Sequence, residues 1–250
     1  MKMKNITSRT SRPTWLAACL ALSISISTVK AEIEPAAREL ANAVSAKIGS
    51  AKTLRLTAKH QLDPALGVGA GHEKGPMQIT VKRPNQFYAI QQAGEETREI
   101  AFDGTTLCLM HPELKHHAME PLKAGSIEQF ADRVDERFGF RPPVAELLAG
   151  DAATQLFLNV TSARVIGTER VGWTRCQRLQ FKQEGIVGDL WVGAKDKLPR
   201  RYRLTFTGVS GSPVWDIRFS KWELNGSVDE TLFTKRPAKD SIKVTMLKSR

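Results

Sequence analysis

Three histidines and two methionines lie close together near the middle of the chain. His111, His116 and His117 are flanked by Met110 and Met119. Imidazole and thioether groups suit copper, and imidazole also suits zinc. Neighbouring residues of a strand point to opposite faces, however, so His116 and His117 cannot easily share one ion. We therefore expect a solvated strand end here, with no metal site and no cofactor.

Two cysteines, Cys108 and Cys176, follow the N-terminal segment. A pair of cysteines in an oxidising compartment can form a disulfide. Both fall on the polar parity of their expected strands, so a Cys108–Cys176 bond and two free thiols stay open as alternatives. No Cys-x-x-Cys motif is present. Thiol-redox catalysis and a structural zinc site therefore have no support.

Motifs of catalytic sites are missing from the chain. Gly-x-Ser-x-Gly and His-Glu-x-x-His do not occur. Asp132, Asp135 and Glu136 cluster on an expected helix, but Arg133 and Arg137 lie among them. Ion pairs on a solvent-exposed helix face explain such a cluster without catalysis. We expect a protein that is not an enzyme and has no catalytic residues.

Residues 1–31 have the pattern of a secretory signal peptide. A basic segment without acidic residues precedes an apolar stretch, 15–26, that is too short for a resident membrane span. Small residues then predict cleavage after Ala31. The alternatives are an uncleaved anchor and a lipoprotein attached at Cys19, which ends the sequence Leu-Ala-Ala-Cys. We expect residues 32–250 to work in the periplasm of a Gram-negative cell envelope.

The charge of the chain is modest once this segment is set aside. The formal net charge of the whole chain is +11, and about +6 remains after the five basic residues of the segment are removed. The remaining basic residues are scattered, which argues against a nucleic-acid partner. A mild attraction to anionic lipid head groups stays open for the basic residues near the last turns, although exposed strand positions explain them equally well. These residues are Lys195, Lys197, Arg200, Arg201 and Arg203.

The apolar pattern predicts one helix followed by many strands. Residues 34–48 have helical spacing, and Gly49 ends the helix. The period then changes to two, which is typical of half-buried strands. A change of parity predicts a β-bulge near Ser220 and Lys221. The expected strands are 54–62, 77–81, 86–91, 97–102, 105–110, 115–119, 160–169, 173–182, 187–192, 200–207 and 214–224, with a short edge strand within 242–246.

A helical segment interrupts the strands. Ser126 and Gln129 have the spacing of a capping box, a second short helix is expected at 144–149, and Asp151 can cap a third. Short connections between strands imply a meander, and a long meander curls. We therefore predict one α+β domain over 32–250, mainly β. It is a curled antiparallel half-barrel of about eleven strands, with helices over its concave face.

Several segments of the chain resemble the strand–turn–strand motifs of the bacterial lipoprotein-carrier superfamily, which includes LolA, LolB, LppX and RseB. The sequence most resembles a family of predicted periplasmic proteins of unknown function within that group. The resemblance covers about residues 34–236 and implies a half-barrel with a cavity for a hydrophobic ligand, by analogy of fold alone. The segments are FDGTTL (102–107) with HPE (111–113), VIGTERVG (165–172) with CQRLQF (176–181), and LWV (190–192) with LPRR (198–201).

The candidate ligand-binding residues share the apolar parity of the strands. They form a hydrophobic cavity if the space beneath the helices is open, and a solid core if it is filled. The cavity candidates are Leu54, Leu56, Met77, Ile79, Leu107, Leu109, Leu179, Phe181, Leu204, Phe206, Ile217 and Phe219. The candidate lid residues, on the first helix of the insert, are Ile127, Phe130, Val134 and Phe138.

These observations favour a non-catalytic, monomeric periplasmic protein that binds or carries a hydrophobic ligand, such as the acyl chain of a lipid or lipoprotein. One alternative is an RseB-like envelope-stress sensor that binds a membrane-protein partner. The other is a structural envelope protein with a solid core.

Overall fold

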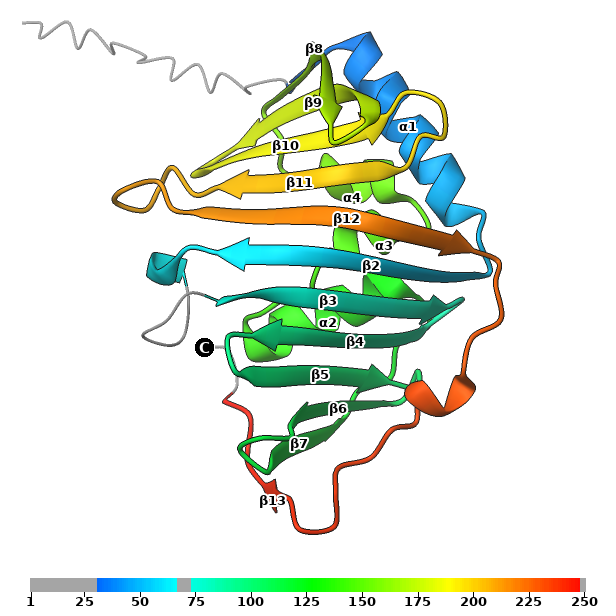
Figure 1. Ribbon diagram of the computed structural model, residues 1–250, viewed down its shortest axis with the longest axis vertical. Coiled ribbons are helices and arrows are strands. Elements are labelled where there is room, and N and C mark those ends of the chain that lie inside the picture. The colour runs from blue at the N-terminus through cyan, green and yellow to red at the C-terminus, as the bar shows by residue number, and fades with distance from the viewer. Residues whose placement is uncertain (1–30, 67–72, 248–250) are drawn as a thin grey trace, which may run out of the picture.

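A curled sheet of thirteen strands forms the body of the protein, and helices lie on one of its faces (Figure 1). The computed structural model describes residues 31–66 and 73–247. The strands are β1 (Glu32–Ile33), β2 (Thr53–Leu62), β3 (Glu73–Lys82), β4 (Gln86–Ala93), β5 (Glu96–Phe102), β6 (Thr106–His111), β7 (His116–Pro121), β8 (Ser162–Val171), β9 (Thr174–Gln183), β10 (Ile186–Gly193), β11 (Pro199–Thr205), β12 (Val214–Leu224) and β13 (Ile242–Lys243). The helices are α1 (Pro35–Gly49), α2 (Ile127–Phe138), α3 (Ala145–Leu148) and α4 (Ala152–Leu156), with 3-10 turns at Pro64–Leu66 and Glu230–Leu232.

Two antiparallel meanders make up the sheet. Strands β2 to β7 form one, strands β8 to β12 form the other, and the antiparallel pairing of β12 with β2 joins them. The two-residue strands β1 and β13 extend the edges by parallel pairing with β8 and β7. The predicted curled, unclosed half-barrel with helices on its concave face is confirmed. Strand β1 was not expected, because two residues are too few to show a period.

A β-bulge in β12 keeps apolar side chains on the concave face. The register with β2 shifts between Phe219 and Lys221, and the hydroxyl of Ser220 donates to the carbonyl of Thr57 at 3.0 Å. The predicted bulge near Ser220 and Lys221 is thus confirmed. One extra residue reverses the parity of the strand, so the aromatic residues before and after the bulge both pack against the main core.

The main core lies between the concave face and the helices. In α2, the hydroxyl of Ser126 accepts a hydrogen bond from the backbone N–H of Gln129, as the capping box predicts. Phe130 of this helix is fully buried and stacks on Phe102 of β5, with ring centroids 4.1 Å apart. Burial of one large apolar side chain contributes about 1.5–3 kcal/mol to stability. The helices are therefore held to the sheet mainly by apolar contact.

A second, smaller core lies on the opposite face of the sheet. After β12 the chain crosses to the far end of the sheet (Figure 1), where Phe233 is fully buried against Tyr88, Cys108 and Met110. Cys108 is therefore buried although it lies on the polar parity of β6. Cys108 and Cys176 are both free thiols, in strands β6 and β9 that have seven other strands between them. The Cys108–Cys176 disulfide, left open by the sequence, is not formed, because distant strands hold the two residues.

Candidate ligand-binding site

The structure places the predicted cavity residues on the concave face. Most of them are closed off from solvent in the main core beneath the helices. Three lie in partly exposed positions near the ends of their strands: Leu109, Leu204 and Phe206. Of the predicted lid residues, Ile127, Phe130, Val134 and Phe138, the first three are buried in the core and Phe138 packs at its margin. Two hollows lie further along the concave face, at one end of the strands.

Cleft A is a hollow of about 360 Å³ between the ends of β2 to β6 and the linker that follows α2. Its walls are mostly apolar, and Leu109 is the predicted cavity residue among them. Phe140 and Pro143 of the linker form the opposite side. The lining residues are Leu62, Glu73, Ala89, Gln91, Arg98, Glu99, Ile100, Leu109, Met110, His111, Phe140, Arg141, Pro143 and Trp215.

Cleft B, of about 510 Å³, lies between the ends of β9 to β12 and helices α3 and α4. The predicted cavity residues Phe181, Leu204 and Phe206 are in its wall. Arg141 and Trp215 line both clefts, so the two hollows adjoin. The lining residues of cleft B are Asp135, Arg141, Pro142, Val144, Glu146, Gln155, Leu156, Leu158, Asn159, Phe181, Gln183, Ile186, Tyr202, Leu204, Phe206 and Trp215.

Arg141 fixes the linker that covers the two clefts. Its guanidinium donates to the carboxylate of Asp132 at 2.8 Å and to that of Asp135 at 3.4 Å, both on α2. Gly139, in the left-handed conformation with φ of 73°, ends α2 and turns the chain into the linker. The acidic cluster that the sequence showed on α2 therefore anchors residues 139–144. These ion pairs are exposed and each contributes little to stability.

Cleft A contains a polar corner. Glu73 and Arg98 form a bidentate ion pair with distances of 2.8 and 2.9 Å between guanidinium nitrogens and carboxylate oxygens. The Nδ1 atom of His111 is buried and has no hydrogen-bond partner among the described residues. Burial, together with the charge of Arg98, lowers the pKa of His111. The imidazole is therefore neutral at neutral pH, and it adds a polar group to the wall of cleft A.

Cleft B contains a second polar pair. Burial raises the pKa of the carboxyl of Glu146, which lies in the first turn of α3. The pKa of Tyr202 on β11 is raised by burial and by the nearby Glu146 carboxylate. Apolar residues surround both groups on the wall of the cleft. The pair thus adds hydrogen-bonding groups to the wall of cleft B.

The three histidines near the middle of the chain differ in their surroundings. The Nδ1 atom of His117 lies 2.9 Å from the hydroxyl of Ser241, and His116 is exposed. No group of three or more His, Cys, Asp or Glu residues is arranged to hold an ion within the described chain. Of the three histidines, only His111 lines a cleft.

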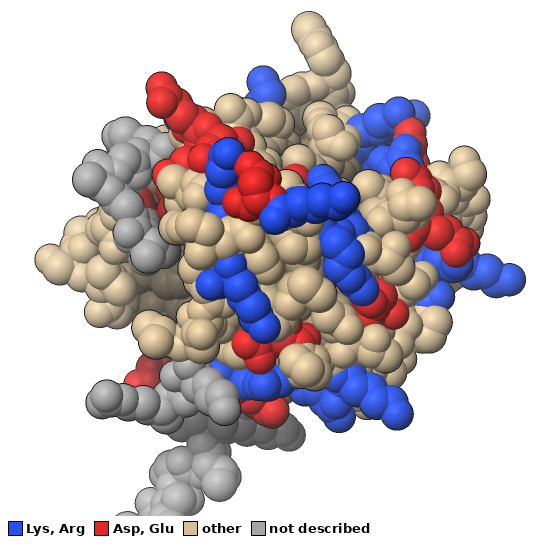
Figure 2. All heavy atoms as spheres, turned by 90° about the horizontal axis from the view of Figure 1, so that it is seen from below, with Lys and Arg blue, Asp and Glu red and all other residues tan. Residues whose placement is uncertain are grey.

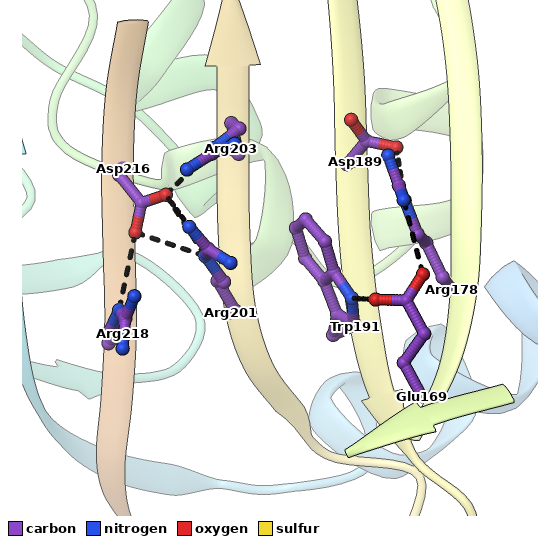
Figure 3. A network of polar contacts seen from close by, with 8 residues as sticks. All are labelled: Glu169, Arg178, Asp189, Trp191, Arg201, Arg203, Asp216 and Arg218. Carbon is purple, nitrogen blue, oxygen red and sulfur yellow. Dashed lines mark hydrogen bonds and ion pairs between the residues drawn. The ribbon is translucent and has the colours of Figure 1, made fainter. Parts of the chain in front are cut away.

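A polar network covers the convex face of β8 to β12 (Figure 3). The indole ring of Trp191 lies between the guanidinium groups of Arg178 and Arg201, 5.0 and 4.8 Å from the ring centroid. Its N–H donates to Glu169 at 2.9 Å. Arg201 also donates to Asp216, which Arg203 contacts at 2.8 Å. Arg201 and Arg203, which the sequence suggested for lipid head groups, are therefore engaged within the protein.

The end of the molecule near β7 and β13 has a mixed charge. Figure 2 shows basic and acidic side chains interspersed over this face. Lys115 pairs with Asp240 at 2.7 Å, and Arg236 pairs with Asp103 at 3.2 Å. The described residues of this face thus form no patch of a single sign. None of the helices in the described ranges is long and apolar enough to cross a membrane.

The sequence pattern did not identify several residues that line the clefts. Trp215 alternates in step with Ile217 and Phe219, so the strand pattern assigned it to the same face as these core residues and gave no sign that it lines open space. Pro143 belongs to the Pro-Pro pair that ends the helical pattern, and Phe140 lies two residues before that pair. That break predicts a linker, and the linker rather than the buried face of α2 covers the clefts.

The chain belongs to a family of predicted periplasmic proteins, DUF2092, which matches residues 37–247. This confirms the resemblance to such a family and agrees with the expected export, while cleavage after Ala31 stays a prediction. No curated protein matches the chain in sequence.

Three solved structures are similar to the fold. The lipoprotein LppX of Mycobacterium tuberculosis has 15% identity and a TM-score of 0.46, with 78% of this chain and 98% of that chain covered. LprF from Mycobacterium bovis has 12% identity and a TM-score of 0.45, with 78% and 96% covered. MucB, in the MucA/MucB complex of Pseudomonas aeruginosa, has 14% identity and a TM-score of 0.47, with 84% and 64% covered. Because each TM-score lies below 0.5, we infer nothing about function from these three proteins.

Proposed function

We propose that this protein binds or carries a hydrophobic ligand with an acyl chain, such as a lipid or the lipid-modified end of a lipoprotein, and that it does so without catalysis. The observation that carries this proposal is the pair of adjoining clefts at the open end of the concave face. Both have largely apolar walls, and both include Trp215 and Arg141. Their volumes of about 360 and 510 Å³ fall within the range of about 300–1,000 Å³ that small-ligand sites occupy.

Apolar contact is sufficient to bind a chain here. Each buried methylene contributes about 0.8 kcal/mol, so an acyl chain seated in one cleft and crossing beneath Trp215 into the other gains useful affinity. His111 lies in the wall of cleft A, and its imidazole is a hydrogen-bonding group near which the polar head of a ligand can lie. We therefore expect an amphiphile whose polar end lies near His111.

Entry of the ligand requires movement of the linker 139–144. The contacts of Arg141 with Asp132 and Asp135 hold this segment through exposed ion pairs, which are weak and can open at small cost. The deeper predicted residues, such as Leu54 and Met77, are buried in the main core beneath the helices. A short chain thus occupies the clefts alone, and a longer one must displace a covering helix.

The first experiment is native mass spectrometry of protein purified from the periplasm without detergent, with lipid extraction in parallel. A co-purifying species of lipid mass is the expected result. The second is titration with a fluorescent fatty acid that brightens in an apolar site. Leu109→Trp should narrow cleft A, and Leu204→Trp should narrow cleft B. Each should weaken binding about tenfold or more, since each removes space for roughly two methylenes.

Trp173→Ala is the matched control for Trp215→Ala, because Trp173 is an exposed tryptophan outside both clefts. Trp215→Ala should weaken fatty-acid binding, and Trp173→Ala should leave it unchanged. Circular dichroism melting confirms that each variant is folded. A bare protein mass together with no fatty-acid binding would contradict the proposal and favour a protein partner or a structural role.

A further inference from the structure

The tip of the β8–β9 hairpin exposes a tryptophan almost completely. Val171 and Thr174 are the last residues that pair, and the turn between them consists of Gly172 and Trp173. The side chain of Trp173 is 96% exposed. A tryptophan normally buries much of its large surface and uses its N–H as a polar handle at interfaces. Nothing within the described protein covers this ring, so the fold itself does not account for it.

Two arginines flank the exposed tryptophan. Arg170 and Arg175 are directly opposite each other across the hairpin and are both exposed. Like charges in this position destabilise a hairpin. The described residues form no ion pair with either side chain, and Arg170 donates only to the carbonyl of Trp173 at 3.4 Å. The repulsion between the two guanidinium groups is therefore not relieved within this part of the protein.

The neighbouring hairpin tip adds further positive charge. The turn between β10 and β11 lies beside β9, because the N–H of Ala194 donates to the carbonyl of Arg175 at 2.9 Å. Lys195 in this turn is exposed. The nearby carboxylates are already paired: Asp196 with Arg200, and Glu169 with Arg178. The two tips together present cations around one exposed aromatic ring.

We propose that the β8–β9 and β10–β11 tips dock on the surface of an anionic lipid bilayer. Trp173 lies at the level of the head groups, where indole rings are favoured, and Arg170, Arg175 and Lys195 contact lipid phosphates. The inference is independent of the clefts, because cleft B lies at the other ends of these strands near Gln183 and Ile186, and no residue of β8 to β11 lines cleft A. The protein thus binds the membrane surface peripherally and reversibly.

Flotation of the purified protein with lipid vesicles tests this proposal. The protein should float with vesicles that contain phosphatidylglycerol, much less with phosphatidylcholine alone, and less again as salt is raised. Trp173→Ala should weaken binding about tenfold, in line with the partial burial of one large apolar side chain. Arg170→Gln and Arg175→Gln should each weaken it about fivefold.

Matched controls separate docking from general effects. Leu114→Ala changes an exposed leucine in the β6–β7 turn, 47% exposed, and Lys239→Gln changes an exposed lysine near the C-terminus. Both should bind vesicles as the unchanged protein does. Brominated lipid should quench tryptophan emission in the unchanged protein and much less in Trp173→Phe.

Arg170→Gln also relieves the repulsion with Arg175, so its thermal stability should stay the same or rise while vesicle binding falls. That combination cannot come from misfolding. The proposal is overturned if the protein does not float with anionic vesicles, or if Trp173→Ala floats as well as the unchanged protein. The fatty-acid titration described above does not use vesicles, so failure of either proposal leaves the other intact.

Discussion

The guanidinium of Arg83 donates a hydrogen bond of 2.8 Å to the carbonyl of Leu148. The same side chain donates to the carbonyl of Ala51 at 3.0 Å and to that of Ala149 at 3.2 Å. These carbonyls lie just beyond α1 and at the end of α3, where helices leave acceptors without partners. One arginine, in the turn after β3, thus joins two helices to the sheet.

Removal of the Arg83 side chain should destabilise the protein. Arg83→Met keeps the apolar stem but leaves the carbonyls without their donor, and the free energy of unfolding should fall by about 3 kcal/mol. Urea unfolding followed by circular dichroism measures the loss. Arg38→Met, on the exposed side of α1, is the control and should change stability by less than about 0.5 kcal/mol. Equal losses of stability in the two variants would show that the hydrogen bonds of Arg83 do not stabilise the fold.

Of two phenylalanines, Phe130 should matter mainly for stability and Phe140 mainly for ligand binding. Phe130→Ala removes a fully buried ring that stacks on Phe102, and it should cost about 3–5 kcal/mol in the free energy of unfolding. Phe140→Ala removes a half-buried ring from the wall of cleft A, so it should cost less and should weaken fatty-acid binding. Denaturant unfolding and the fluorescent titration on both variants check this. A Phe140→Ala protein with undiminished affinity would place the ligand elsewhere.

The ion pairs of Asp216 should make the protein sensitive to acid. Burial alone favours the neutral carboxyl, but hydrogen bonds from Arg201 and Arg203 outweigh it and lower the pKa of Asp216 below 3.8. A carboxyl whose pKa is lowered by folding stabilises the protein above its unfolded pKa. That contribution is lost as the pH falls through the folded pKa.

Asp216→Asn should therefore be less stable at neutral pH, and its stability should depend less steeply on pH below 3.8. Urea midpoints measured from neutral to acidic pH test this. Asp240→Asn is a suitable control, because Asp240 pairs with Lys115 on the exposed surface, where an ion pair contributes little. Parallel pH curves for the unchanged protein and Asp216→Asn would refute the role given to this carboxylate.

Cys108 and Cys176 should both be found as free thiols. Burial raises the pKa of each thiol, which leaves less thiolate and slows alkylation in the native protein. Iodoacetamide should modify both thiols in protein unfolded without reductant, and neither appreciably in native protein. Digestion of the two alkylated samples, followed by mass spectrometry, measures the modification of each cysteine. A Cys108–Cys176 cross-linked peptide would mean that the strand arrangement is wrong.

The intact mass of the exported protein should correspond to residues 32–250. This follows from the predicted signal cleavage after Ala31. A mass that retains the first residues would indicate an uncleaved anchor. A lipidated N-terminus at Cys19 would instead support the lipoprotein alternative.

Local periodicity determined which segments are helices and which are strands. The cap at Ser126, the helix over 34–48 and the bulge beside Ser220 were all readable, because each depends on residues a few positions apart. Parity along the strands also assigned the concave face. Even the helical interruption was placed correctly, since the change from period two to helical spacing is a local signal.

Only the tertiary structure decided where the concave face is closed and where it is open. Leu54 and Leu204 share the same apolar parity, yet the first is sealed beneath the helices and the second lines cleft B. The difference depends on where the helices, the linker and Arg141 come to lie over the concave face. Periodicity records which side of a strand faces the core. It does not record how far away the covering segment lies, because that distance is set by the sum of many contacts between residues remote in sequence.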